Sequence, residues 1–291
     1  MVIRKAIVAG QFYPGDAARC RAELRDLLRA ESAAVETTTR LIGGLVPHAG
    51  WICSGAVAGK VFAALAATRQ PSTIILLGGV HRYGSRRAAV FSDGVWETPL
   101  GHLETDSALA RRVLEASDLF ANDPRAHESE HSLEVQAPFI KHLFPSAKIL
   151  PIMVPSTIDS DKVGRAVAVA IEAENRDAIV VGTTDLTHYG PDYGFMPHGL
   201  GREGNRWAKD ANDPKFIELV CAMRFGDLVA ETTVSRNACS SGAAAATVAA
   251  CAALGATQGV LLDHTSSSEV LSRLGYPEGE NSVGYAGIVF K

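Results

Sequence analysis

Three histidines of this chain each follow a short apolar run that predicts a β-strand. His48 follows "LIGGLV", His81 follows "TIILL", and His188 follows "AIVV" after a few intervening residues. Ligand sites in open α/β sheets lie beyond the carboxyl ends of the strands, so neighbouring strands would bring these imidazoles together. Imidazole is both a common metal ligand and a common general base. The pattern therefore predicts a metal or acid–base site at one edge of a sheet.

Two further segments carry reactive side chains. Cys239 precedes an Ala-rich run at residues 240–254 that predicts a helix, and a cysteine at a helix N-terminus has its thiolate stabilised. His131 and Glu134 are three residues apart in a helix expected at 131–144, so they would share one helix face. We expect this pair to reach the same pocket and to contact substrate there.

The first chemistry that fits is a metal centre. His48, His81 and Cys239 would hold the ion, because imidazole and thiolate suit iron, copper or zinc. Three protein ligands leave coordination positions open for substrate. Asp185 and His188 would then serve as catalytic acid and base, or as further ligands. A carboxylate, from Glu134 or Asp185, is the alternative third ligand.

The second chemistry is nucleophilic. Cys239 would attack, His188 would act as its base and Asp185 would orient that base. The sequence leaves both chemistries open, because both place the same side chains in one pocket.

The elements that position these residues alternate between strands and helices. Strands are expected at 41–46, 73–77, 88–91, 149–154, 178–181, 258–262 and 283–290, and helices at 16–30, 55–67, 106–116, 131–144, 162–173, 214–223 and 240–254. Ser54 is expected to cap the second helix, and Pro138 to kink the fourth or mark its start. This alternation predicts an α/β fold with a mainly parallel sheet flanked by helices, in a single domain over residues 1–291.

Composition narrows the class of protein. The chain has 291 residues, 47% of them hydrophobic, and 28 basic against 32 acidic residues give a net charge of −4. No basic stripe is visible, so neither nucleic acid nor an anionic membrane is an expected partner. The longest apolar stretch noted, residues 242–254, is too short to span a bilayer. Five irregularly spaced cysteines and no recognisable export signal predict a reducing, cytoplasmic location.

Six motifs, in order, resemble the Memo family, whose prokaryotic members are also called AmmeMemoRadiSam system protein B. They are "AGQFYPGD", "VPHAGW", "GGVHRYG", "EHSLEVQAPFI", "TTDLTHYG" and the segment around Cys239. The resemblance covers nearly the whole chain. It implies a fold similar to that of the class III non-haem iron extradiol dioxygenases.

The resemblance also implies a site and partners. Iron or copper would be held by His48, His81 and Cys239, with Asp185 and His188 in the same pocket. A small molecule or a peptide would bind in that pocket, and AMMECR-type and radical-SAM proteins would be partners. The family implies no defined reaction.

Three functions follow from these observations. The first is a metal-dependent redox or dioxygenase-like enzyme, an oxidoreductase with a His/His/Cys site. The second is a binding or adaptor protein that retains the pocket without catalysis. The third is a cysteine hydrolase built on Cys239, His188 and Asp185.

Overall fold

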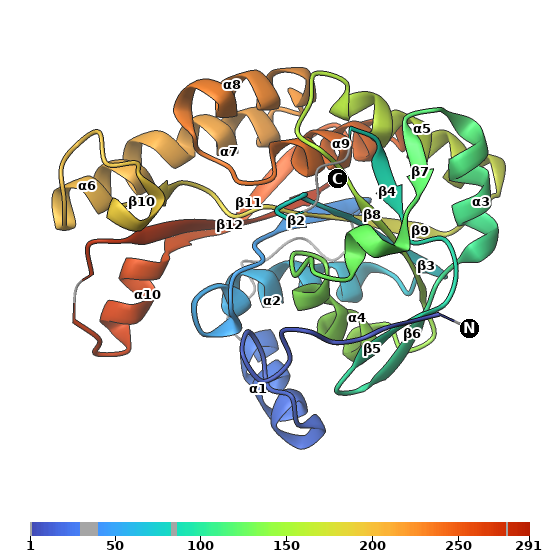
Figure 1. Cartoon of the computed structure of the whole chain (residues 1–291), viewed down its shortest axis with the longest axis horizontal. Coiled ribbons are helices and arrows are strands. Elements are labelled where there is room, and N and C mark those ends of the chain that lie inside the picture. The colour runs from blue at the N-terminus through green and yellow to red at the C-terminus, as the bar shows by residue number, and fades with distance from the viewer. Residues whose placement is uncertain (1, 30–39, 83–85, 278) are drawn as a thin grey trace.

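The main sheet of the protein is mixed, with a parallel centre and antiparallel flanks. The computed structural model describes residues 2–29, 40–82, 86–277 and 279–291. In the sheet the strands run in the order β10-β12-β2-β9-β3-β8-β4-β7, and β11 pairs with β12. The central strands β2, β9, β3 and β8 are parallel, whereas β12 and β4 join them antiparallel. The predicted parallel sheet is thus its central part (Figure 1).

The strands of this sheet have the following bounds: β2 Gly43–Val46, β3 Thr73–Gly78, β4 Ala88–Val90, β7 Phe120–Asn122, β8 Lys148–Met153, β9 Ala178–Thr183, β10 His188–Tyr189, β11 Gly259–Ser266 and β12 Ser282–Phe290. The α-helices are α1 Ala17–Arg29, α2 Trp51–Thr68, α3 Ser107–Ala116, α4 Ala137–Leu143, α5 Ser160–Ala173, α6 Arg202–Trp207, α7 Asp213–Cys221, α8 Leu228–Ser235, α9 Ser241–Ala253 and α10 Ser267–Arg273.

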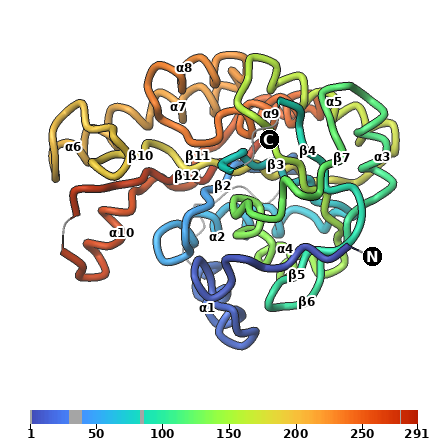
Figure 2. Tube along the Cα trace, in the orientation of Figure 1, coloured from blue at the N-terminus to red at the C-terminus, as the bar shows by residue number. Residues whose placement is uncertain are grey.

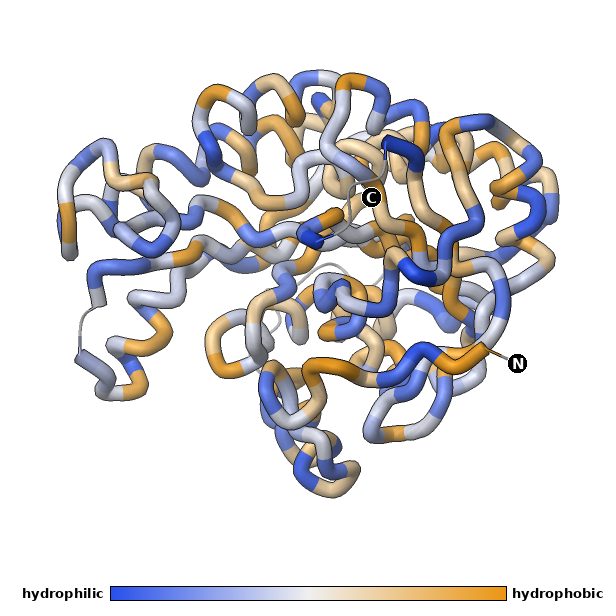
Figure 3. Tube along the Cα trace, in the orientation of Figure 1, coloured by the Kyte–Doolittle hydropathy of each residue, from blue (hydrophilic) through white to orange (hydrophobic). Residues whose placement is uncertain are grey.

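Helices cover both faces of the sheet, which explains its continuous apolar runs. Ile75 and Leu77 of β3 belong to the core formed with α3, α5, α7 and α9. Ile74 and Leu76, which alternate with them, belong to the core formed with α1, α2 and α4. A strand buried on both faces has no polar face, so "TIILL" does not alternate in polarity. The colouring of Figure 3 shows the hydrophobic residues gathered in these layers.

Close packing on one face depends on a glycine. A Cβ atom on Gly164 of α5 would lie 1.9 Å from the carbonyl oxygen of Ala246 in α9. No side chain fits there, so the two helices approach each other through backbone.

A second sheet was not predicted from the sequence. Its three strands, β1 Ile3–Arg4, β5 Val95–Thr98 and β6 Gly101–Glu104, lie in the order β1-β5-β6. Its strands have only two to four residues each, too few to show a periodicity. In the trace of Figure 2 the N-terminal segment runs beside β5.

Two expectations about helices are corrected, and parts of two other segments lie outside the described residues. The helix expected at 131–144 begins later than predicted. Residues 131–133 precede it, Glu134–Gln136 form a 3₁₀ turn, and α4 follows with Pro138 near its start. Ser54 lies inside α2, where its hydroxyl donates to the carbonyl of Ala49 at 2.8 Å. Ala30, the expected end of the first helix, and Tyr83 and Gly84 of "GGVHRYG" lie outside the described residues.

Helix α2 is longer than the apolar stretch at 242–254. Among the described residues it is the helix long and apolar enough to cross a membrane by length and composition, with a mean hydropathy of 1.4. Its inner residues, Val61, Phe62 and Leu65 among them, are buried against the sheet and α4. Packing in the core therefore accounts for its composition.

Candidate metal centre

His48 lies just beyond the carboxyl end of β2 and is held there by β9 and the residues that follow it. Its Nδ1 lies 2.9 Å from the hydroxyl of Thr183, and its backbone N–H donates to Asp185 Oδ1 at 2.7 Å. The residue is only 2% exposed. Because Nδ1 is engaged by Thr183, Nε2 is the nitrogen that faces the centre.

His81, beyond the end of β3, is held by Glu130. Both the backbone N–H of His81 and its Nδ1 lie 2.9 Å from oxygens of this carboxylate. Glu130 also accepts the backbone N–H groups of His131 and Ser132. A carboxylate on Nδ1 fixes the imidazole's orientation and leaves Nε2 for a metal, an arrangement that recurs in metal sites.

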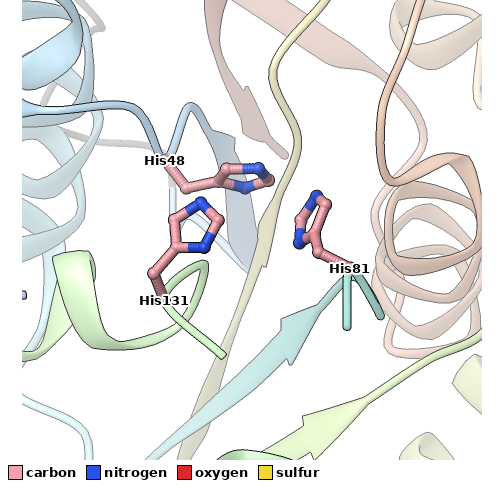
Figure 4. A group of neighbouring side chains, drawn as sticks. All are labelled: His48, His81 and His131. Atoms are coloured by element: carbon pink, nitrogen blue, oxygen red, sulfur yellow. The ribbon is translucent and has the colours of Figure 1, made fainter. Parts of the chain in front are cut away.

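His131 completes a cluster of three imidazoles. The ring centroids of His48, His81 and His131 lie 5.1 to 5.5 Å apart. One ring nitrogen from each lies within 4.8 Å of the others, so the three could hold a metal ion. Figure 4 shows the rings directed toward a common space from three separate segments.

Cys239 contributes a sulfur to the same centre. Its Sγ lies 3.2 Å from Nε2 of His48 and accepts the backbone N–H of Asp185 at 3.3 Å. In return the N–H of Cys239 donates to the carbonyl of Asp185 at 3.1 Å. A Cβ on Gly79 would lie 2.1 Å from the hydroxyl oxygen of Ser240, so glycine lets the His81 segment approach the Cys239 segment.

A buried polar network ties the Asp185 and Cys239 segments to the start of α7. Asp213 accepts the backbone N–H of Thr187 at 3.0 Å and also its hydroxyl. Asn212 donates to the hydroxyl of Thr187 at 3.1 Å, and Asn237 donates to the carbonyl of Asn212 at 3.1 Å. Asn212 ends a π-helix at Ala208–Asn212, a feature often found at functional sites. These hydrogen bonds hold the Asp185 segment and the Cys239 segment in place against the start of α7.

The protonation of the centre follows from its contacts. Burial lowers the pKa of His81, but hydrogen bonds with Cys239 and Glu130 outweigh burial and raise it to about 9. Burial and the neighbouring His48 lower the pKa of His131 to about 4. Burial raises the pKa of Glu130, but its hydrogen bond with His81 outweighs this and holds the pKa well below its usual range. Glu130 is therefore a carboxylate at neutral pH, and His131 is a neutral imidazole.

Glu134 makes its contacts with the N-terminal segment, and its role in binding substrate stays a prediction. It is 0% exposed and pairs with Arg4. It also accepts the N–H of Val8 at 2.9 Å and the hydroxyl of Tyr13 at 2.7 Å. His131 precedes the helix, so the pair does not share a helix face as expected.

His188 makes its contacts with residues outside the three-imidazole cluster. Its Nδ1 lies 3.0 Å from the carbonyl oxygen of Leu186, and its ring meets that of Tyr193 edge-on at 4.9 Å. Within the described part of the chain, no hydrogen bond joins His188 to Cys239. The sulfur is paired with His48 instead, so the Cys239–His188 contact that a cysteine hydrolase requires is not formed.

Sequence reasoning missed Glu130, whereas it expected His131 to reach the pocket in which the structure places it beside His48 and His81. The signal available was the position of both in "EHSLE", directly before a buried turn. Neither follows an apolar strand, so the rule that found His48 and His81 does not reach them.

Comparison with known proteins identifies the family of this chain. A family model described as Memo-like protein matches residues 4–289. The chain belongs to the Memo family. A MEMO1 family protein of Pyrococcus furiosus is 33% identical over 100% of this chain and 99% of its own length. A MEMO1 family protein of Methanopyrus kandleri is 32% identical over 99% of each chain.

The Memo fold extends to a distant solved structure. The uncharacterized protein JW3007 from Escherichia coli K12 matches 87% of this chain and 100% of its own, with a TM-score of 0.56 and 14% identity. At this identity the likeness concerns the fold alone, and it agrees with the predicted class of an α/β sheet flanked by helices.

Proposed function

We propose that this Memo protein is a metal-dependent redox protein that holds iron or copper at His48, His81 and Cys239. The observation that carries the proposal is the convergence of imidazoles from three segments, with one nitrogen of each within 4.8 Å of the others and the Cys239 sulfur beside them. Around one ion, imidazole nitrogens at ~2.0–2.1 Å would lie about 4 Å apart or less, so small rotations suffice.

The donor set fits a transition metal. Hard cations prefer oxygen ligands, whereas imidazole and thiolate suit iron, copper and zinc. Nδ1 of His48 and of His81 are engaged by Thr183 and Glu130, so Nε2 is the nitrogen of each that would ligate. When bound, such an ion supplies Lewis acidity and, for iron or copper, one-electron chemistry.

The protein groups around the ion have separate tasks. His131, neutral because of its lowered pKa, faces the same space and can accept a proton from a bound molecule. Asp185 Oδ2 lies 4.0 Å from Nε2 of His48, and this carboxylate sets the position of His48 through the backbone. His188 keeps Nε2 available beyond the cluster, because its Nδ1 is held by Leu186. Asp185 and His188 are thus our candidates for the catalytic acid–base pair.

Metal content tests the proposal. We expect about one iron or copper per chain after anaerobic loading, measured by elemental analysis, with anomalous diffraction at both edges locating the ion. His81→Ala and Cys239→Ala should bind less than about a tenth as much. His102→Ala alters an exposed histidine on β6 and is the matched control. Wild-type protein that takes up neither metal would overturn the proposal.

Oxygen consumption separates an enzyme from an adaptor. We expect uptake of dioxygen with ascorbate or a catechol that depends on His81 and not on His102. Full metal occupancy without any turnover would favour the adaptor. The small-molecule or peptide ligand, the AMMECR-type and radical-SAM partners and the cytoplasmic location stay predictions.

A further inference from the structure

We propose a second binding site, for the phosphate group of a small phosphorylated molecule, in the cavity between α6 and α10. The cavity measures about 350 Å³, and its lining comes from α6, the following π-helix, the end of β11 and α10. These elements lie together at one end of the molecule in Figure 2. None of the residues of the metal centre lines it.

Three cations line one side of this cavity. Arg202 and Arg206 come from α6, and Lys209 comes from the π-helix that continues it. Arg202 and Arg206 are one helical turn apart.

A fourth cation faces them from α10. Arg273 lines the cavity, and Glu269 on the same helix lies between the two sides. The carboxylate of Glu269 is 2.7 Å from Lys209 Nζ and 3.6 Å from Arg273 Nη2, so one acid is shared by two cations. Asp210 is the other acid of the lining. The lining thus contains more cations than acids.

Arg206 is the side chain best placed to take a ligand. Within the described ranges the guanidinium of Arg206 makes no hydrogen bond or ion pair, whereas Lys209 and Arg273 contact Glu269 and Arg202 is also engaged. A guanidinium presents a planar fork of donors that matches two oxygens of a phosphate. Ser266, Ser268 and Ser272 add hydroxyl groups to the lining, which supply further donors.

The setting favours a small ligand over a polyanion. The cations line a hollow of about 350 Å³ and the chain as a whole carries a net charge of −4. Nucleic acid and anionic membranes are bound by extended basic surfaces, whereas the cations described here gather around one small hollow. A phosphate group fits the hollow, and the rest of its molecule would fill the remaining volume.

The test measures binding of inorganic phosphate by isothermal titration calorimetry. We expect saturable binding of about one phosphate per chain, weakened on the order of tenfold by Arg206→Gln and by Arg273→Gln. Arg112→Gln changes an exposed arginine on α3, outside the cavity, and should leave binding unchanged. Arg206→Lys keeps the charge without the fork, so it should weaken binding less than Arg206→Gln.

The alternatives give distinct results. Arg206 is exposed and makes no contact that folding requires, so Arg206→Gln stays informative even if Arg273→Gln unfolds. No saturable phosphate binding, or equal weakening by Arg112→Gln, would overturn the site. Tighter binding of a short DNA duplex than of phosphate, lost in the same variants, would overturn the small-ligand assignment. Metal content should be the same in all variants, so the outcome is independent of the proposed redox function.

Discussion

Glu130 and Glu134 show how one motif can serve both the metal centre and the fold. Both belong to "EHSLE", and they are only 2% and 0% exposed. The carboxylate of Glu130 contacts the imidazole of His81, whereas the carboxylate of Glu134 pairs with Arg4 in the N-terminal segment. The two carboxylates share residue type, burial and neighbourhood in the sequence. Their roles differ only through the partner that each meets, so the motif alone cannot separate a positioning residue from a structural one.

The largest effect should come from Glu134→Gln. Removing one partner of a buried ion pair leaves Arg4 uncompensated, so we expect a loss of about 3–5 kcal/mol in the free energy of unfolding. Urea denaturation measures it. Glu97→Gln breaks an exposed pair with Lys5 and should cost at most about 1 kcal/mol. A loss below that of Glu97→Gln would contradict the structural role.

Glu130→Gln should act on the metal instead. Loss of a carboxylate that orients a ligating histidine lowers metal affinity by about 10–100-fold. Competition with a chelator measures the affinity of the folded protein. Unchanged metal affinity would show that Glu130 is not required to orient His81 for metal binding. Glu130 and Glu134 would then no longer differ in role.

The contact between Glu130 and His81 should also make the free energy of unfolding of the metal-free protein depend on pH. The pKa of His81 is raised from 6.5 to about 9, so the folded state binds more protons than the unfolded state between these values. The stabilisation is complete below pH 6.5 and is lost as the pH rises through about 9, by roughly 1–3 kcal/mol. Urea denaturation across this range measures it. Glu130→Gln should flatten the dependence, and a slope unchanged in that variant would count against the pair.

The smallest effect should come from Thr183→Val. The hydroxyl of Thr183 is a neutral partner of His48 Nδ1 at 2.9 Å, and its loss should weaken metal binding by about fivefold, in line with ~1 kcal/mol for one hydrogen bond. The chelator competition used for Glu130→Gln measures this too. A loss as large as that of Glu130→Gln would show that the charge of Glu130 is not what matters.

Much of the sheet could be predicted because its strands are buried on both faces. Runs such as "TIILL" and "AIVV" mark the central strands, and the residues after them are His48, His81 and Asp185 at one edge. The short strands β1, β5 and β6 carry no such pattern, so the second sheet could not be seen. Local spacing also misplaced Glu134, because Arg4 lies 130 residues away along the chain.

His131 marks the limit of such reasoning. It was expected to contact substrate from a helix, yet it lies before that helix and faces His48 and His81. Only the packing of the 124–136 segment against the end of β3 brings it there. The side chain of Gln136 donates to the carbonyl of Pro47 at 2.8 Å, and this contact helps to fix the segment. No short-range pattern in the sequence predicts this hydrogen bond.

The wide separation of the ligands along the polypeptide has a consequence for biosynthesis. His48 and Cys239 meet across 191 positions, so a ribosome must deliver most of the chain before the sulfur can join the imidazoles. Contacts between such distant segments form late in folding. An ion held by the proposed donor set would therefore be acquired only after release or in the last stages of elongation.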